Sequence, residues 1–208
     1  MGKEGAFMAD ITVRNATLAD APRILEIYAY YVEHTVITFE YTVPSLEEFE
    51  GRMRHTMEKY PYLVIEKDGR IEGYAYAGAF VGRAAYDWAC ELTIYLDHNA
   101  QKCGMGRMLY QALADRLKAM GILNLYACIG YPQVEDEYLT RNSAQFHKHL
   151  GFALCGTFRN CGYKFGRWYN MSWAEKLLME HPEHPEPVIP FPQLDKALVA
   201  DILRRSAE

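Results

Sequence analysis

The chain has 208 residues, of which half are apolar and 13% are aromatic, and this is enough for one domain with a full hydrophobic core. Its 22 basic and 27 acidic residues give a formal net charge of -5, which disfavours nucleic acid and anionic membranes as partners. No apolar run is long enough for a transmembrane helix, and residues 1–10 lack the apolar stretch of a signal peptide, so we expect a cytoplasmic protein with a flexible N-terminus.

Two helices are predicted in the first third of the chain. Residues 11–14 alternate as a short strand would, and the capping residues and proline of 17–22 then indicate a helix start. A second helix begins after Ser45, which forms a capping-box pattern with Glu48. Pro61 ends it, because proline removes a backbone donor and clashes with the preceding turn.

A hairpin and a strand-loop-helix unit are predicted next. Runs at 62–65 and 71–76 flank Asp68-Gly69, a strong signal for a tight hairpin turn. A strand at 90–96 then leads through a glycine-rich loop into an amphipathic helix over 108–120. This order matters because the free N–H groups at a helix start bind anions.

The last third of the chain changes character near its end. Residues 123–129 alternate as a strand, the stretch 131–140 is polar and acidic, and 142–150 is predicted as a helix followed by a strand pair. Residues 181–192 are rich in proline and are not expected to form regular structure. Helical spacing over 194–205 predicts an appended helix.

Cysteine and histidine spacing predicts neither a disulfide framework nor a metal site. The five cysteines are odd in number and form no C-x-x-C pair. The close pairs His147/His149 and His181/His184 lack the spacing that places two imidazoles on one helical face. We therefore expect no metal.

The glycine-rich loop at 101–106 reads Gln-Lys-Cys-Gly-Met-Gly. Glycines before a helix allow a pyrophosphate to approach the backbone N–H groups without a metal, although a lone G-x-G can also be only a tight loop. A dinucleotide fold would need a glycine where Leu109 stands, and an ATP-binding loop would need Gly-Lys-Ser/Thr. Both of those nucleotide interpretations are therefore weakened.

In its context, this loop resembles the Q/R-x-x-G-x-G/A acetyl-CoA signature of the GNAT superfamily of N-acetyltransferases. Four further segments resemble the branch that acetylates phosphinothricin and methionine sulfone: 85–91, 129–132, 147–152 and 162–168. The matching order covers a domain at 11–175 and leaves 176–208 as a proline-rich strap and C-terminal helix. The resemblance implies an α/β GNAT (acyl-CoA N-acyltransferase) fold with a mixed, mostly antiparallel sheet flanked by helices. It also implies a V-shaped opening for CoA between neighbouring strands, and a homodimer.

The resemblance also assigns the reacting groups. An alkyl amine keeps its proton until about pH 10, so a base is useful at neutral pH, and the family's base corresponds to Glu91. His147 stands where this branch has a histidine near the sulfur, and it either protonates the departing thiolate or only orients CoA. Direct transfer of the acetyl group is favoured over a covalent intermediate.

Acetyl-CoA is the implied donor. Its pantetheine arm would pair with the backbone of Ile94, Tyr95 and Leu96, like an added strand. Its pyrophosphate would be held by the loop and helix start: Lys102, Cys103, Gly104, Met105, Gly106 and Arg107. Asn142 resembles a CoA-contacting asparagine, with Gln133 as its competitor because 134–141 looks inserted.

The sequence says less about the acceptor amine than about the acetyl donor. Arg83 and Tyr86 lie just before the predicted base, where a guanidinium can bind a carboxylate through two hydrogen bonds, although a surface arginine and a core tyrosine are the alternative. The resemblance implies that the rest of the acceptor pocket, partly across a dimer interface, is formed by Phe39-Glu40 and Tyr163-Lys164. Phe165 replaces a common histidine, and Asn170 replaces an acidic residue. The favoured acceptor is a small amino acid or analogue, of the phosphinothricin or methionine sulfone type. The alternatives are another small amine, a protein N-terminus, or a CoA-binding regulator without turnover, against which the retained Glu91 and His147 argue.

Overall fold

The computed structural model describes residues 10–100, 104–195 and 199. Nine of the ten positions of the segment 1–10, loop positions 101–103 and most of the predicted helix 194–205 therefore lie outside the described residues. The elements, in chain order, are β1 (Ile11–Asn15), η1 (Leu18–Asp20), α1 (Ala21–His34), α2 (Leu46–Met57), β2 (Tyr62–Lys67), β3 (Arg70–Ala79), η2 (Ala84–Tyr86), β4 (Ala89–Leu96), α3 (Met105–Met120), β5 (Asn124–Tyr131), α4 (Asn142–His149), β6 (Ala153–Lys164), β7 (Arg167–Leu177) and η3 (Phe191–Gln193).

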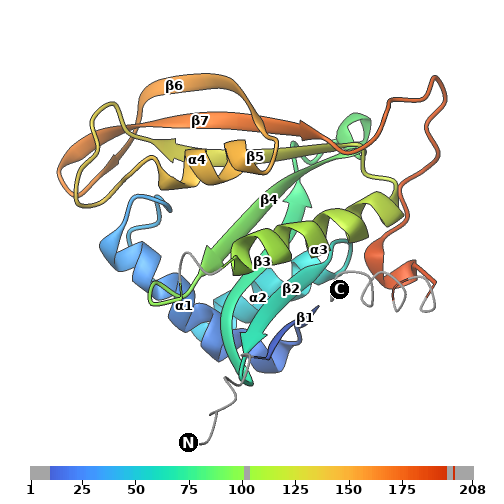
Figure 1. Ribbon diagram of the computed structural model, residues 1–208, viewed down its shortest axis with the longest axis horizontal. Helices are drawn as coiled ribbons and strands as arrows, with labels where there is room; N and C mark the ends of the chain where they lie inside the picture. The colour runs from blue at the N-terminus through green and yellow to red at the C-terminus, as the bar shows by residue number, and fades with distance from the viewer. Residues whose placement is uncertain (1–9, 101–103, 196–198, 200–208) are drawn as a thin grey trace, which may run out of the picture.

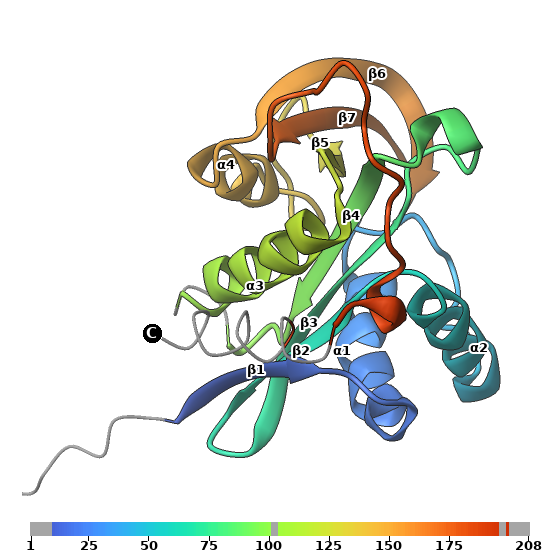
Figure 2. The same ribbon diagram turned by 90° about the vertical axis from the view of Figure 1, so that its right-hand side faces the viewer.

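The strands form one mixed sheet in the order β1-β2-β3-β4-β5-β7-β6. β4 and β5 run parallel, and the other neighbouring pairs are antiparallel. Helices α1 and α2 cover one face of the sheet, and α3 and α4 cover the other, as Figures 1 and 2 show. The arrangement confirms the expected α/β fold with a mostly antiparallel sheet between helices.

Each face of the sheet carries its own hydrophobic core. On the α3 side, Leu109, Leu113 and Leu117 lie four residues apart, so they form one stripe, and all three are fully buried. Each contributes about 1.5–3 kcal/mol by leaving water. On the other side, α1 and α2 pack Ile24 and Met53 against the sheet. The burial of these stripes is what fixes the helices to the sheet.

The predicted helix starts are present, with one difference in how they are capped. Thr17 and Asp20 form a full capping box, but the turn that follows it is the 3₁₀ turn η1, and α1 begins only after it. At α2, the Ser45 hydroxyl accepts a hydrogen bond from the Glu48 N–H at 3.2 Å. The Glu48 carboxylate instead pairs with Arg52 at 2.6 Å, because Arg52 lies one turn along the helix.

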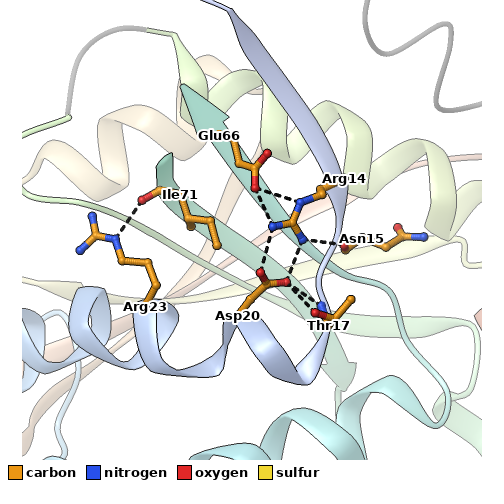
Figure 3. A network of polar contacts seen from close by, with 7 residues as sticks. All are labelled: Arg14, Asn15, Thr17, Asp20, Arg23, Glu66 and Ile71. Carbon is orange, nitrogen blue, oxygen red and sulfur yellow. Dashed lines mark hydrogen bonds and ion pairs between the residues drawn. The ribbon is translucent and has the colours of Figure 1, made fainter. Parts of the chain in front are cut away.

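An ion-pair network joins β1, β2 and the start of α1 (Figure 3). The Arg14 guanidinium lies between Asp20 and Glu66, with N···O distances of 2.8 and 2.6 Å. Asp20 also accepts a hydrogen bond from the backbone N–H of Thr17 at 2.7 Å. Arg14 holds the pKa of Asp20 below its usual range. The network thereby fixes the angle at which the chain leaves β1 and enters α1.

The proline-rich strap, residues 181–192, runs back over the body of the protein after β7. Its Ile189 N–H donates to the carbonyl of Met120, and its Phe191 N–H donates to that of Lys59, both at 2.9 Å. The indole Nε1 of Trp88 donates to the Glu186 carbonyl at 2.8 Å. These bonds dock the strap across the ends of α2, α3 and β4. None of the helices in the described ranges has the length and apolar character needed to cross a bilayer.

Candidate active site

The sheet opens between β4 and β5. β4 pairs with β3 over 90–96, and β5 pairs with β7 along its whole length. β4 and β5 pair with each other only where 89–91 lies beside 124–126, and Figure 1 shows them diverging beyond that point. The edge of β4 from Leu92 onward therefore faces an opening, which is where the family resemblance places the V-shaped entry for CoA.

Helix α3 begins at this opening. Gly104 precedes its first turn with a φ of +83°, a left-handed conformation that disfavours any residue with a Cβ. A Cβ on Gly106 would lie 3.1 Å from the Phe146 ring and 3.4 Å from Leu96, so glycine is needed there for close packing. Met105 is buried and Arg107 is exposed. The first turn therefore has free N–H groups at the edge of the opening, as an anion site requires.

The predicted pantetheine contacts lie on the free stretch of β4. Ile94 points toward the core beneath α3, whereas Tyr95 points toward α1, where it packs against Tyr28 and Tyr31. The carbonyl of Leu96 accepts a hydrogen bond from the Tyr31 hydroxyl at 2.5 Å. The side chains of this stretch are thus engaged in the two cores, and only its backbone is left to pair with a ligand.

The remaining predicted donor residues divide into described and undescribed ones. Lys102 and Cys103 lie outside the described residues. Asn142 is the exposed first residue of α4, and its competitor Gln133 is also exposed. The Gln133 carbonyl accepts a hydrogen bond from Arg141 at 3.0 Å. The side chains of Asn142 and Gln133 are therefore both accessible for a contact with CoA.

The Glu91 carboxyl lies beside the last pairing of β4 with β5 and points toward the α1/α2 face. It is half-buried, and it has no hydrogen-bond or ion-pair partner among the residues that the structure describes. Burial raises the pKa of this carboxyl above its usual range. A carboxylate that is poorly solvated and unpaired is a stronger proton acceptor than one on the surface.

His147 is a buried residue of α4, and both of its ring nitrogens are occupied. Nδ1 lies 2.7 Å from the Ser143 carbonyl, so it must carry the proton and donate. Nε2 then accepts from the Tyr110 hydroxyl at 2.8 Å. Burial lowers the pKa of His147, so the ring is neutral at pH 7. Of its two expected roles, this geometry favours orientation over protonation, because the proton of the pair resides on Tyr110.

A cavity of about 130 Å³ lies on the Glu91 face of the sheet. Its wall includes Thr93, the next residue on β4 whose side chain points to that face, and the ion pair of Glu40 with Arg52 at 2.6 Å. Aromatic rings form much of the remainder: Tyr28, Phe49, Tyr62, Tyr74, Tyr76 and Tyr95. The cavity combines polar and aromatic groups next to the predicted base, as a site for a small amine needs.

Lys164 has a different role from the expected contact with the acceptor. Its side chain is 2% exposed, and its ammonium group donates to the carbonyls of Val32, Thr35 and Thr38 at 2.8, 2.8 and 2.9 Å. An ammonium has three N–H donors, and these three carbonyls use all of them. Lys164 therefore binds the end of α1 and the loop after it, because a cation is stabilised by the carbonyls at a helix C-terminus.

The other residues predicted near Lys164 surround the same loop. Phe39 packs tightly against Gly162, since a Cβ there would lie 2.1 Å from its ring. Tyr163 is exposed, and its carbonyl accepts a hydrogen bond from the Tyr41 hydroxyl. The structure thus brings Phe39, Tyr163 and Lys164 together at the β6–β7 hairpin, with Phe39 and Tyr163 closer to solvent.

The inserted segment 134–141 docks on this hairpin. Its Tyr138 ring stacks on Phe165 with a centroid distance of 4.3 Å, so the residue that replaces the expected histidine has an aromatic partner. Asp136 accepts hydrogen bonds from Arg167 and from the Tyr169 hydroxyl, at 3.0 and 2.8 Å. The insertion therefore reshapes the hairpin side of the site. Asn170, the second departure, accepts from the Asn160 N–H at 2.9 Å, beside the irregular part of β6.

Arg83 and Tyr86 lie at the other end of the Glu91 face. Both are exposed, with Tyr86 inside η2 and Arg83 just before it. The Tyr86 ring lies edge-on to Phe80, at 6.2 Å between centroids, and Phe80 stacks on Tyr126, the residue paired with Glu91. The rings of Phe80 and Tyr126 thus lie between Tyr86 and Glu91, and the Arg83 side chain is exposed to solvent.

Comparison with known families agrees with this geometry. The sequence model of the acetyltransferase (GNAT) domain matches residues 13–173. The chain belongs to the GNAT acetyltransferase family. Among GNAT proteins, it is 33% identical over 184 residues to a phosphinothricin N-acetyltransferase of Streptomyces viridochromogenes, covering 88% of this chain and 96% of that one. It is also 30% identical to an L-methionine sulfoximine/L-methionine sulfone acetyltransferase of Salmonella typhimurium, over 82% of this chain and 96% of the relative.

A solved GNAT structure extends the similarity to the fold. The phosphinothricin acetyltransferase of Sinorhizobium meliloti, crystallised with acetyl-CoA, superposes with a TM-score of 0.76 at 33% identity. The alignment covers 87% of this chain and 98% of that one. In the described part of this GNAT chain, no group of three or more His, Cys, Asp or Glu side chains is placed to hold a metal ion.

Several residues at this GNAT site were not singled out from the sequence. Arg52 comes from helix α2 and meets the loop residue Glu40 only in the folded chain. Tyr110 was part of an amphipathic helix pattern and carried no signal of its pairing with His147. Thr93 could have been found, because alternation along the strand places it on the same face as Glu91.

Proposed function

We propose that the protein transfers the acetyl group of acetyl-CoA directly to the amine of a small amino acid or analogue, of the phosphinothricin or methionine sulfone type. The observation that carries the proposal is the half-buried Glu91 carboxyl, unpaired among the described residues, at the opening between β4 and β5. The start of α3 lies at the same opening, so a base and an anion site would face one ligand.

The donor would bind along the opening. Its pantetheine arm would hydrogen-bond the backbone groups of Ile94, Tyr95 and Leu96 that face the opening, where the Leu96 carbonyl already accepts from Tyr31. Its pyrophosphate would meet the N–H groups at the start of α3. A backbone N–H of β4 directed at the thioester would stabilise the oxyanion of the tetrahedral intermediate. Relatives crystallised with acetyl-CoA support this choice of donor.

Glu91 would remove a proton from the acceptor ammonium, directly or through one water. The freed amine attacks the thioester carbon, a C–N bond forms and the C–S bond breaks. The proton lost by the new amide nitrogen passes to the departing sulfur, so that CoA is released as the thiol. We assign His147 the orienting role, holding Tyr110 through the bond at its Nε2. Burial raises the pKa of Tyr110 far above its usual range, so its hydroxyl stays protonated, and it would donate to the departing sulfur by turning away from His147 Nε2.

The acceptor would lie on the Glu91 face between two groups of residues. Arg83 and Tyr86 would bind its carboxylate, and Phe39 and Tyr163 would contact its side chain near the β6–β7 hairpin. The similarity to phosphinothricin and methionine sulfone acetyltransferases favours a small amino acid acceptor over other amines.

Thiol release from acetyl-CoA with a panel of amino acids, free amines and N-terminal peptides tests the proposal. Glu91→Gln is expected to lose turnover by about 10²–10⁴-fold, the usual contribution of a general base. Glu175→Gln is the matched control, because Glu175 lies on β7 opposite Tyr126 and outside the opening. Full turnover by Glu91→Gln would exclude the base assignment. Turnover of peptides alone would favour a protein N-terminus, and acetyl-CoA binding without any turnover would favour a regulator.

We further propose a cytoplasmic homodimer. The cysteines described as free thiols, among them the exposed Cys128, Cys155 and Cys161, suit a reducing compartment. Large apolar side chains are exposed on the edge strand β6 and on β7, including Phe158 and Trp168 at 56% and 62%. Phe158→Glu, measured by sedimentation beside the wild type, is expected to shift the protein to a monomer, and an unchanged dimer would exclude this surface.

A further inference from the structure

A second cavity lies on the Glu91 face, at the end of β4 remote from α1. Its volume is about 280 Å³. Its walls come from the loop after β3, from β4 and β5, and from the proline-rich strap. The sheet and its loops contribute Phe80, Tyr86, Trp88 and Tyr126, and the strap contributes His181 and Pro182. Drug-sized ligands occupy pockets of about 300–1,000 Å³, so this one would take a group the size of a ring or a short alkyl chain.

Strand register places this cavity next to the predicted base. Glu91 pairs with Gly78 on β3 and with Tyr126 on β5, so the side chain of Tyr126 points to the Glu91 face. Phe80 and Ala89 lie two positions from Gly78 and Glu91, and therefore point to the same face. Two residues of a strand span about 7 Å. If the acceptor amine lies at Glu91, a group attached two or three bonds from that amine would therefore reach the cavity.

The walls of the cavity are largely aromatic and apolar, and several of their polar groups are paired with one another. Phe80 stacks on Tyr126 with a centroid distance of 4.1 Å. The Asn124 side chain donates to the Tyr126 hydroxyl at 3.2 Å and accepts from His181 Nε2 at 2.7 Å. The Trp88 indole is bonded to the Glu186 carbonyl. An apolar or aromatic ligand group would leave water for these walls without breaking those hydrogen bonds.

We propose that this cavity is a subsite for an apolar group of the acceptor, a benzyl group or an alkyl chain of three or more carbons, next to the transferred amine. The proposal rests on the proposed acetyltransferase function. The group can be the side chain of an amino acid or a substituent on its carboxyl end, since both are within reach of Glu91. The strap then forms part of the acceptor site, because His181 and Pro182 line the same cavity as Phe80.

The test compares kcat/KM for alanine, phenylalanine and the benzylamide of alanine, with alaninamide as the reference for the last. A buried methylene improves binding about fourfold, and a fully buried phenyl ring improves it about tenfold or more. At least one of the two benzyl compounds is expected to exceed its reference about tenfold. A gain for phenylalanine identifies the side chain as the occupant, and a gain for the benzylamide identifies the carboxyl substituent.

Two variants test the two walls. Phe80→Ala and His181→Ala are each expected to reduce the benzyl preference at least threefold. Val81→Ala is the matched control, because Val81 follows Phe80, is exposed and does not line the cavity, and it should keep the wild-type ratio. Circular dichroism and acetyl-CoA binding verify that each variant is folded.

The outcomes separate the two proposals. Turnover of alanine without any benzyl preference, or a preference that both wall variants retain, overturns the subsite and leaves the acetyltransferase intact. Absence of turnover with every amine, by a protein that binds acetyl-CoA, overturns the proposed function itself and the subsite with it.

Discussion

Replacement of Lys164 by methionine separates a structural role from a binding role. The ammonium of Lys164 donates to three carbonyls at the end of α1 and in the following loop, at 2.8–2.9 Å. Methionine fills a similar volume and donates to none of them. Each carbonyl that loses a buried donor costs about 1 kcal/mol, so we expect the free energy of unfolding to fall by about 3 kcal/mol.

A fall of this size corresponds to a decrease in Tm of roughly 6–12 °C for a chain of this length. Thermal unfolding followed by circular dichroism measures it. Lys67→Met, at an exposed position at the end of β2, is the matched control and should change Tm by no more than about 1 °C. The loop that Lys164 holds carries Phe39 and Glu40, so KM for the acceptor should rise together with the loss of stability.

The opposite pattern would refute this reasoning. If Lys164→Met kept the Tm of Lys67→Met while KM for the acceptor rose, Lys164 would be contacting the acceptor, as the family resemblance implies. If both Tm and KM stayed unchanged, the three hydrogen bonds would contribute nothing measurable to folding.

Three further perturbations test the site. Glu91→Gln should remove the acidic limb of the pH profile of kcat/KM, which in the wild type should lie above the usual glutamate pKa of about 4.5. The same variant should raise Tm at pH 7, because a carboxyl with a raised folded-state pKa loses stability as pH rises through the interval between its unfolded and folded pKa values. Gly104→Ala places a Cβ at a φ of +83° and should cost about 1–2 kcal/mol while weakening acetyl-CoA binding, measured by calorimetry. Tyr110→Phe should lower kcat by about tenfold with little change in the KM for the acceptor, because it removes the hydroxyl that His147 holds.

Each of these has its own control. Below about pH 4 the Tm difference of Glu91→Gln should vanish, since the carboxyl is then protonated in both states, and a difference that persists there would contradict the linkage. Gly51→Ala in the middle of α2 meets no atom within 4 Å and should stabilise the helix, so equal effects at Gly51 and Gly104 would rule out backbone strain. Unchanged kcat in Tyr110→Phe would remove Tyr110 from the reaction.

Local signals in the sequence predicted the elements well. Asp68-Gly69 predicted a hairpin between β2 and β3, and both residues adopt positive φ, as a tight two-residue turn requires. The strand-loop-helix order around Gly104 also predicted the start of α3, whereas the opening came only from the family resemblance. The hairpin and the helix start depend on residues close together in the chain, so pattern and propensity are enough to find them.

Contacts between distant segments could not be predicted in the same way. Lysine is usually exposed, and Lys164 is buried only because three carbonyls more than 120 positions away converge on it. The strand order that places β7 between β5 and β6 likewise depends on pairing of distant segments. The proposed apolar subsite depends on the strap lining the same cavity as Phe80. Nothing in the spacing of 181–192 indicates where that strap docks.

The short parallel pairing of β4 with β5 has a mechanical consequence. Three residue pairs are the whole backbone ladder between one half-sheet, β1 to β4, and the other, β5 to β7. The two halves are otherwise joined by the core beneath α3, by the bonds of Lys164 to the end of α1 and the loop after it, and by backbone bonds from Leu123 and Asn124 to Trp88. A donor lying in the opening would hydrogen-bond to β4 on one side and pack against β5 on the other. It would thereby bridge the two strands where they do not pair with each other. A bound donor would therefore couple the two halves more tightly than the three ladder pairs do alone.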